Sequence, residues 1–260
     1  MGKAVRNEGS LPSGAEVVAF HQACLARPGW PRDEGQESAA QARDERVEGR
    51  GAAGGAGAAE GAAGGAGDGT GAGAAPGSGV WQWIEANHRY NSLLWAEEDL
   101  ARRTQVSDDE IAGNKRNIDR YNQARNDATE RVDELLLIAL GLVSEASAAG
   151  DAPESTPAPG ARLNSETAGS MIDRLSILAL KVEAMRLQTQ RTDVDEGHRQ
   201  ATRTRLERLQ TQRDDLASCL DELVADSRDG RAYFKVYRQF KMYNDARFNP
   251  ALVAEAARAG

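Results

Sequence analysis

The sequence predicts an all-α fold, a bundle of five to six mostly antiparallel helices with a long disordered insertion rich in glycine and alanine. Beyond Gly79, apolar residues recur at helical spacing almost to the C-terminus, and strand-like alternation is absent. The connections between these segments are short, which is typical of antiparallel neighbours in a bundle. The candidate helices span 80–106, 108–146, 169–193, 198–226 and 230–245, and a short helix at 15–26 must dock on them.

Capping residues mark where two of these helices begin. Ser107 stands before three acids, which is the pattern of an N-cap followed by an acidic first turn. For the helix near Gly169, Ser165 or Thr167 can cap the first turn, while Ser170 with Asp173 fits a capping box directly before an apolar run. The sequence leaves these caps as alternatives.

The glycine-rich segment lies between Gly49 and Gly79. It holds 14 of the 27 glycines, contains GAAGGAG twice and has no aromatic residue, so it cannot bury enough apolar surface to offset the entropy of ordering. Together with the charged stretch before it, we expect disorder over 31–79. The organisation is then an N-terminal segment at 1–30 with its docking helix, the insertion at 31–79, a helical domain at 80–250 and a C-terminal tail at 251–260.

Composition excludes several classes of protein. The net charge of -8 disfavours nucleic acid as a partner, because affinity for it comes mostly from phosphate neutralisation. The longest apolar run, 135–143, is far shorter than the roughly 20 residues of a membrane span. The N-terminus lacks the apolar core of a signal peptide, so a cytoplasmic location is expected. The two cysteines lie far apart and predict neither a disulfide framework nor a zinc site.

Polar side chains interrupt the apolar seams of three predicted helices. The seam of the helix at 108–146 includes Asn122 and Arg125, and that of the helix at 198–226 includes Arg213 among leucines. The helix at 80–106 has a seam that is half polar, running through Ile84, His88, Asn91, Trp95, Glu98 and Arg102. We therefore expect a mixed interior with inward arginines, which need partners because an unpaired buried charge is strongly unfavourable.

Two interpretations of this polarity stay open. Arg125 and Arg213 can pair with nearby acids and fix the register of the helices. Alternatively, a few polar groups remain unpaired and converge on a cleft that takes an anionic ligand. The candidate ligand-binding residues are Asn122, Arg125, Arg213, Lys241, Asp173, Arg174, Glu98 and Asp99.

The segment RAYFKVYRQFKMYNDARFNP, at 231–250, combines basic and aromatic residues. As a final helix, it would pack Tyr233, Tyr237 and Phe240 inward and leave the basic groups in water. The alternative is a recognition arm for phosphate or sugar, in which aromatic faces stack and arginine binds the anion.

Metal and nucleophile signatures are weak. Glu85 with His88 and Asp195 with His198 have the i, i+3 spacing of carboxylate-bridged metal sites in bundles, but the second pair has Asp in place of Glu. No nucleophile elbow, phosphate-binding loop or dinucleotide fingerprint is present. We predict no metal and no cofactor, and no catalytic residue is assigned.

Several ordered motifs resemble one known family. The stretches LWAEEDLARR, KRNIDRYNQARND, LNSETAGSMIDRLSILALK, QRTDVDEGH, QRDDL and KVYRQFKMYND are similar to those of the bacterial domain-of-unknown-function family 4254, over about residues 80–250 and the short first helix. Members are often encoded beside glycosyltransferases of the lipopolysaccharide heptosyltransferase type. The resemblance therefore implies a role around surface-glycan synthesis, with a glycosyltransferase-type protein or an anionic sugar as partner, and supplies no reaction. The family motif has a histidine directly after the tryptophan, whereas Ala96 follows Trp95 here.

Three functions remain after this resemblance. The chain is a non-catalytic accessory that binds a partner or an activated sugar, an enzyme that uses Glu98, Asp99 or Asp173 as acid or base, or a structural interaction module whose polar seams set register. A helical bundle hosts all three, so the fold class does not choose between them.

Overall fold

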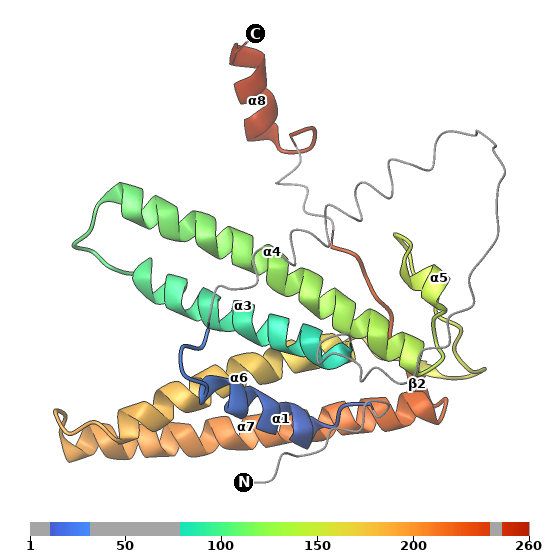
Figure 1. Cartoon of the computed structure of the whole chain (residues 1–260), viewed down its shortest axis with the longest axis horizontal. Helices are drawn as coiled ribbons and strands as arrows, with labels where there is room; N and C mark the ends of the chain where they lie inside the picture. Colours follow the sequence, from blue (N-terminus) through green and yellow to red (C-terminus); the bar gives the residue numbers. More distant parts are fainter. Residues whose placement is uncertain (1–10, 32–78, 240–245, 260) are drawn as a thin grey trace, which may run out of the picture.

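The computed structural model describes residues 11–31, 79–239 and 246–259. They form the predicted all-α fold, built on two long helical hairpins (Figure 1). The first hairpin joins α3 (Val80–Leu100) to α4 (Asp108–Ala139), and the second joins α6 (Ala168–Thr189) to α7 (Glu196–Arg228). The short helix α1 (Gly14–Leu25) packs against α6 and α7. The predicted disordered segment 31–79 lies outside the described residues except for Pro31 and Gly79.

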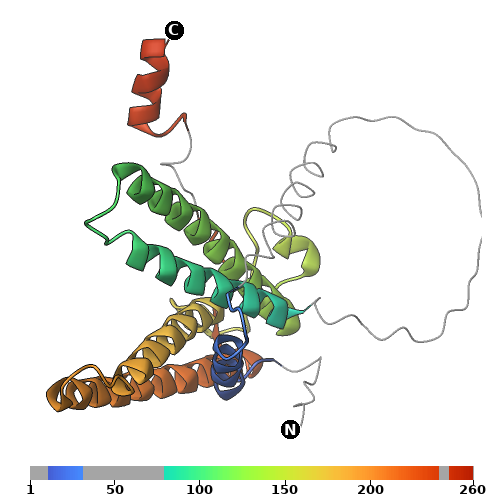
Figure 2. The same cartoon turned by 60° about the vertical axis from the view of Figure 1, so that its left-hand side comes forward.

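The two hairpins meet at one end and diverge toward the loops that close them (Figure 2). The main core lies where they meet, because the apolar stripes of α1, α3, α4, α6 and α7 all converge there. Among its fully buried side chains are Val17, Ile84, Leu137, Leu175, Leu220 and Phe234. A smaller cluster of Tyr90, Leu94, Ile118 and Tyr121 continues between α3 and α4.

Two helices begin at capping residues that the sequence indicates. Ser107 forms a capping box with Glu110 at the start of α4, as the sequence indicates. At α6, Thr167 is the N-cap, and its Oγ1 accepts a hydrogen bond of 3.1 Å from the backbone N–H of Ser170. Of the alternatives at this helix, Thr167 is therefore the one realised, and the side chain of Asp173 faces α3 instead of the helix terminus.

Three predicted helices end earlier than expected, and the one predicted over 169–193 ends at Thr189. The helix predicted over 80–106 ends at Leu100, and that predicted over 108–146 ends at Ala139. Gly141 follows with a φ of 69°, a left-handed conformation that suits glycine and stops the helix. A single turn, α5 (Glu145–Ala148), then begins at its own cap, Ser144.

The prediction of a helix over 230–245 is wrong for residues 230–239, which are the part of this range that the structure describes. Gly230, with a φ of 73°, ends α7, and the chain continues as strand β2 (Ala232–Tyr233) and extended backbone to Gln239. β2 pairs in parallel with β1 (Arg162–Leu163). Ala232, Phe234 and Val236 are buried and the residues between them are more exposed, so burial has the period of two that an extended chain requires. Residues 240–245 lie outside the described part.

The predicted C-terminal tail contains a helix, α8 (Pro250–Ala259). It stands apart from both hairpins in the two views (Figures 1 and 2). Among the described residues, no helix has the length and apolar character needed to cross a membrane.

Close backbone contact between α1 and α7 depends on Gly14. Its N–H donates a hydrogen bond of 2.7 Å to Asp221, and a Cβ atom at this position would lie 2.3 Å from the carbonyl oxygen of Ala217. We expect Gly14→Ala to lower the free energy of unfolding by about 1–3 kcal/mol, because the backbones must separate. The matched control is Gly113→Ala in α4. An added Cβ atom there would have no neighbouring side chain or packed backbone within 4 Å, and alanine should stabilise the helix. Thermal unfolding followed by circular dichroism measures both, and equal melting temperatures would contradict the close contact.

Candidate functional site

A buried polar network joins α3 to α4 and α6. Asn87 donates to Asp173 at 2.8 Å and to Thr129 at 3.0 Å. Asn91, one turn further along α3, donates to the same oxygen of Asp173 at 2.8 Å and to Ser176 at 3.0 Å. Both amide groups thus donate to Oδ1 of Asp173, the oxygen that they share. The network therefore fixes Asp173 as an acceptor on the side of α6 that faces α3.

Arg125 extends this network toward the surface. Its Nε lies 3.9 Å from the carboxylate of Asp173, and its Nη2 donates to Asn126 at 2.9 Å. The side chain is 24% exposed, and its buried Nε has no hydrogen-bond partner. A buried donor without an acceptor is costly, so this atom marks a place where a ligand or water is expected.

A cleft of about 360 Å³ opens beside Arg125, between α3, α4 and α6. It brings together four of the residues that the sequence singles out, namely Glu98, Asp99, Asn122 and Arg125. The remaining lining residues are Asn91, Leu94, Trp95, Arg102, Ile177 and Leu180. Asp173 lies next to this cleft through its contacts with Asn91 and Arg125. The half-polar seam of α3 thus follows the wall of a cleft.

The other candidates lie elsewhere. Arg174 lines a second, larger cleft of about 910 Å³ between α6 and α7, where it pairs with Glu166 at 2.5 Å. Arg213 borders neither cleft and pairs with its neighbour Asp214 at 2.9 Å. Its side chain is 14% exposed, so both inward arginines are largely buried and near a carboxylate, as predicted. Lys241 lies outside the described residues.

The two carboxylate–histidine pairs belong to different environments. Glu85 is engaged by Arg27 at 2.7 Å, while Nδ1 of His88 contacts the hydroxyl of Ser176 at 2.8 Å. Asp195 is the N-cap of α7, where it accepts from the backbone N–H of His198 at 2.7 Å. Within the described ranges, no three His, Cys, Asp or Glu side chains are placed to hold a metal ion.

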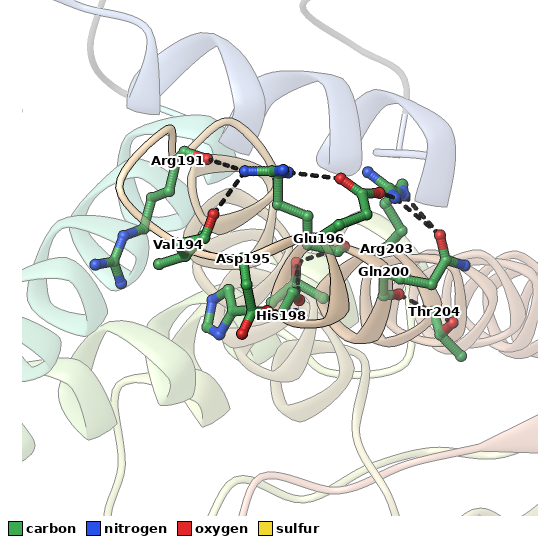
Figure 3. A network of polar contacts seen from close by, with 10 residues as sticks. Arg191, Val194, Asp195, Glu196, His198, Gln200, Arg203 and Thr204 are labelled. Carbon is green, nitrogen blue, oxygen red and sulfur yellow. Dashed lines mark hydrogen bonds and ion pairs between the residues drawn. The ribbon is translucent and has the colours of Figure 1, made fainter.

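The loop between α6 and α7 is held by arginines, which accounts for the charge in QRTDVDEGH (Figure 3). Arg199 donates to the carbonyl of Val194 at 2.7 Å and to Glu196 at 2.9 Å, and Arg203 contacts Glu196 and Gln200. These bonds satisfy loop carbonyl groups and hold the first turn of α7. His198 is exposed at this loop, and its Nε2 lies 3.3 Å from Gln188.

The structure adds residues that sequence reasoning missed. Asn87 and Ser176 complete the network, although neither is on a seam that the spacing selects. His21 and Trp30, from the N-terminal segment, lie on the far side of His88, with ring centroids 4.4 Å and 5.4 Å from it. The contact of His21 with His88 requires the tertiary fold and has no local signal in the sequence.

Comparison with known proteins gives one result. Residues 81–236 match the model of a family described as Protein of unknown function (DUF4254). Searches among curated proteins and among solved structures found no significant match. The matched residues are more than half of the chain and include α3, α4, α6, α7 and the buried network between them. The chain therefore belongs to the DUF4254 family.

Proposed function

We propose that this chain is a non-catalytic binding protein that takes a sugar-containing ligand in the cleft between α3, α4 and α6, as an accessory in surface-glycan synthesis. The observation that carries the proposal is the buried Nε of Arg125, which has no hydrogen-bond partner and belongs to a cleft-lining guanidinium. A guanidinium with an unused N–H is suited to a carboxylate or phosphate oxygen.

The other lining groups suit a polyhydroxylated ring. Trp95 offers an aromatic surface with which the apolar face of a sugar can pack. Glu98 and Asp99 can accept hydrogen bonds from hydroxyl groups, and Asn122 can both donate and accept them. A few polar groups placed among apolar side chains are typical of small-molecule sites.

The charge of the cleft limits the ligand. Its lining has two carboxylates and two guanidinium groups, so the lining residues sum to zero. Arg102 is paired with Glu98 at 2.9 Å, whereas Arg125 has a longer ion pair with Asp173, at 3.9 Å, and is the guanidinium better placed to meet an anionic group. The proposed ligand therefore presents one anionic end to Arg125 and its sugar to the acids and Trp95. The involvement of Arg213 and Lys241 in the same site has no support from the described contacts.

The setting in glycan synthesis rests on the family resemblance, since members are often encoded beside glycosyltransferases. A glycan-related enzyme is the second candidate, because Glu98 and Asp99 line the same cleft as Arg125 and one of them can act as acid or base. The binding function is favoured because the described cleft has no Ser, Cys or His side chain in its lining to serve as nucleophile or base.

A thermal-shift screen with nucleotide sugars and sugar phosphates tests this proposal. A ligand specific for the native state adds about 2.7 kcal/mol of stability at 100 times its dissociation constant. We expect Arg125→Met to abolish the shift, whereas Arg205→Met, an exposed arginine on α7, should retain it. Asp173 keeps its two asparagine donors in the Arg125 variant, so the fold should persist.

The outcomes separate the candidates. Equal loss of the shift in both variants indicates diffuse charge attraction and contradicts the site. No shift with any sugar compound contradicts the ligand-binding function. Conversion of the ligand during incubation, followed by NMR and lost in Glu98→Gln or Asp99→Asn, would establish the enzyme in place of the binding protein.

A further inference from the structure

Three stacked rings join the N-terminal segment to α3. The imidazole of His21, on α1, stacks on that of His88 with centroids 4.4 Å apart and an interplanar angle of 28°. Trp30, after α1, stacks on His88 at 5.4 Å and 23°. The indole N–H of Trp30 donates to Ser92 at 3.1 Å, and Ser92 donates to the carbonyl of His88 at 2.8 Å. The contact of α1 with α3 is thus centred on a pair of histidines.

Most ring nitrogens of this pair have no acceptor or donor opposite them. Both histidines are 0% exposed. Neither nitrogen of His21 has a hydrogen-bond partner, nor does Nε2 of His88, while Nδ1 of His88 contacts Ser176. An imidazolium ion has two N–H donors and needs an acceptor for each. The stack therefore accommodates neutral rings and has no place for charged ones.

The charged groups described around the stack do not stabilise a proton on either imidazole. Arg27 and Arg89 lie over the ring of Trp30 at 5.7 Å and 5.9 Å. The nearby carboxylates are already engaged: Glu85 by both of these arginines, Asp173 by two asparagines and Asp221 by the N–H of Gly14. On α1, Cys24 is the remaining titratable side chain that is buried, and its thiol is uncharged at low pH.

Burial lowers the pKa of both imidazoles. It holds that of His21 well below its usual 6.5, and the charge of His88 adds to the effect. For His88, burial lowers the pKa from 6.5 to about 4 against the opposing effect of a contact with the backbone of His21, and the charge of Arg27 lowers it further. A released ring titrates near 6.5, so the docked state is stabilised fully above that pH and loses this stabilisation as the pH falls from 6.5 toward 4.

We propose that the His21–His88 stack is a proton-controlled clasp, which holds α1 on the hairpins at neutral pH and releases α1 in mild acid. Release separates the rings, lets each imidazolium reach water and uncovers the apolar face of α1 that Val17, Phe20 and Cys24 form. The clasp does not depend on the proposed ligand. The stack is joined to the cleft through Ser176, which contacts both His88 and Asn91, a residue of the cleft.

The accessibility of Cys24 measures the clasp directly. In a Cys219→Ser variant of the full chain, Cys24 is the remaining thiol and is buried. The rate at which Cys24 reacts with 4,4′-dithiodipyridine, a reagent that labels thiols in acid, is divided by the rate for the denatured chain at the same pH. Since one pKa unit is a tenfold change, His88 alone accounts for labelling that is about thirtyfold faster at about pH 5 than at about pH 7.5, and the parent should exceed this value because His21 titrates as well. Helical circular dichroism should stay unchanged.

Two variants make the test specific. In His21→Phe, the ring on α1 no longer binds a proton and leaves His88 as the single titrating member, so the acceleration in acid should fall severalfold. His198→Phe removes an exposed histidine and should leave the acceleration unchanged. The proposal is overturned if Cys24 stays protected at about pH 5, if His21→Phe accelerates as much as the parent, or if helical signal is lost together with protection.

Discussion

Replacing Arg238 by Met should lower the free energy of unfolding by about 3–5 kcal/mol, because it leaves buried acceptors without their partner. Arg238 is 18% exposed and contacts Glu134, whose side chain is 1% exposed, as well as Glu130 at 3.2 Å. Its Nη2 also donates to the carbonyls of Ala148 at 3.0 Å and Gly150 at 3.2 Å. Arg131 still pairs with Glu134 at 2.5 Å in the variant, but it cannot replace the carbonyl contacts.

Chemical denaturation followed by circular dichroism gives this free energy, and Arg186→Met is the matched control. Arg186 pairs with Glu183 on the surface of α6, where solvent screens the ion pair and its removal should change stability little. The double variant Arg238→Met with Glu134→Gln should recover part of the loss, because the buried carboxylate is then neutral. If Arg238→Met costs no more than Arg186→Met, the burial of this network is not what anchors the extended segment.

The fold class was predictable because local signals agree with it. Ser107, Thr167 and Asp195 each cap a helix through their own side chain, and the positions of such residues are visible in the sequence. The extended segment after Gly230 was not predictable in the same way. Its aromatic and basic residues fit one face of a helix, yet pairing with β1 and the contacts of Arg238 favour extended backbone. Phe234 and Val236 are buried and flank the more exposed Lys235, and this alternation of apolar and polar residues is visible in the sequence.

The sequence predicted which residues of each helix are polar at seam positions, but it did not predict which helices meet to form the cleft. Helical spacing selected Asn91, Glu98 and Arg125 because polar residues at seam positions must face another helix. Spacing says nothing about which seams meet, so Arg213 was grouped with Arg125 although it borders neither cleft. The contact of His21 with His88 joins residues on either side of the long insertion, and no local pattern connects them.

Neutralising Asp133 should change how stability depends on pH. Asp133 is 4% exposed and accepts hydrogen bonds from the N–H of Gly169, at 2.6 Å, and from Thr167. Its pKa is raised from 3.8 to about 7, chiefly by burial and in smaller part by the charges of Glu130 and Glu134, against the lowering effect of the two hydrogen bonds. A raised pKa means that the folded chain holds this proton more tightly, so its contribution to stability is complete below pH 3.8 and is lost as the pH rises toward 7.

Asp133→Asn removes this contribution because the amide stays neutral at every pH. The free energy of unfolding of the variant should therefore rise relative to that of the parent between about pH 4 and 7, by an amount on the order of 4 kcal/mol. The comparison uses a difference between two chains, so the opposing loss of stability from His21 and His88 in acid cancels. Asp193→Asn is the control: its pKa is lowered to about 2 by Arg191, so it stays ionised over this range and its difference should be flat. An equally flat difference for Asp133→Asn would show that its carboxyl group is ionised in the folded chain throughout, with Gly169 and Thr167 outweighing burial.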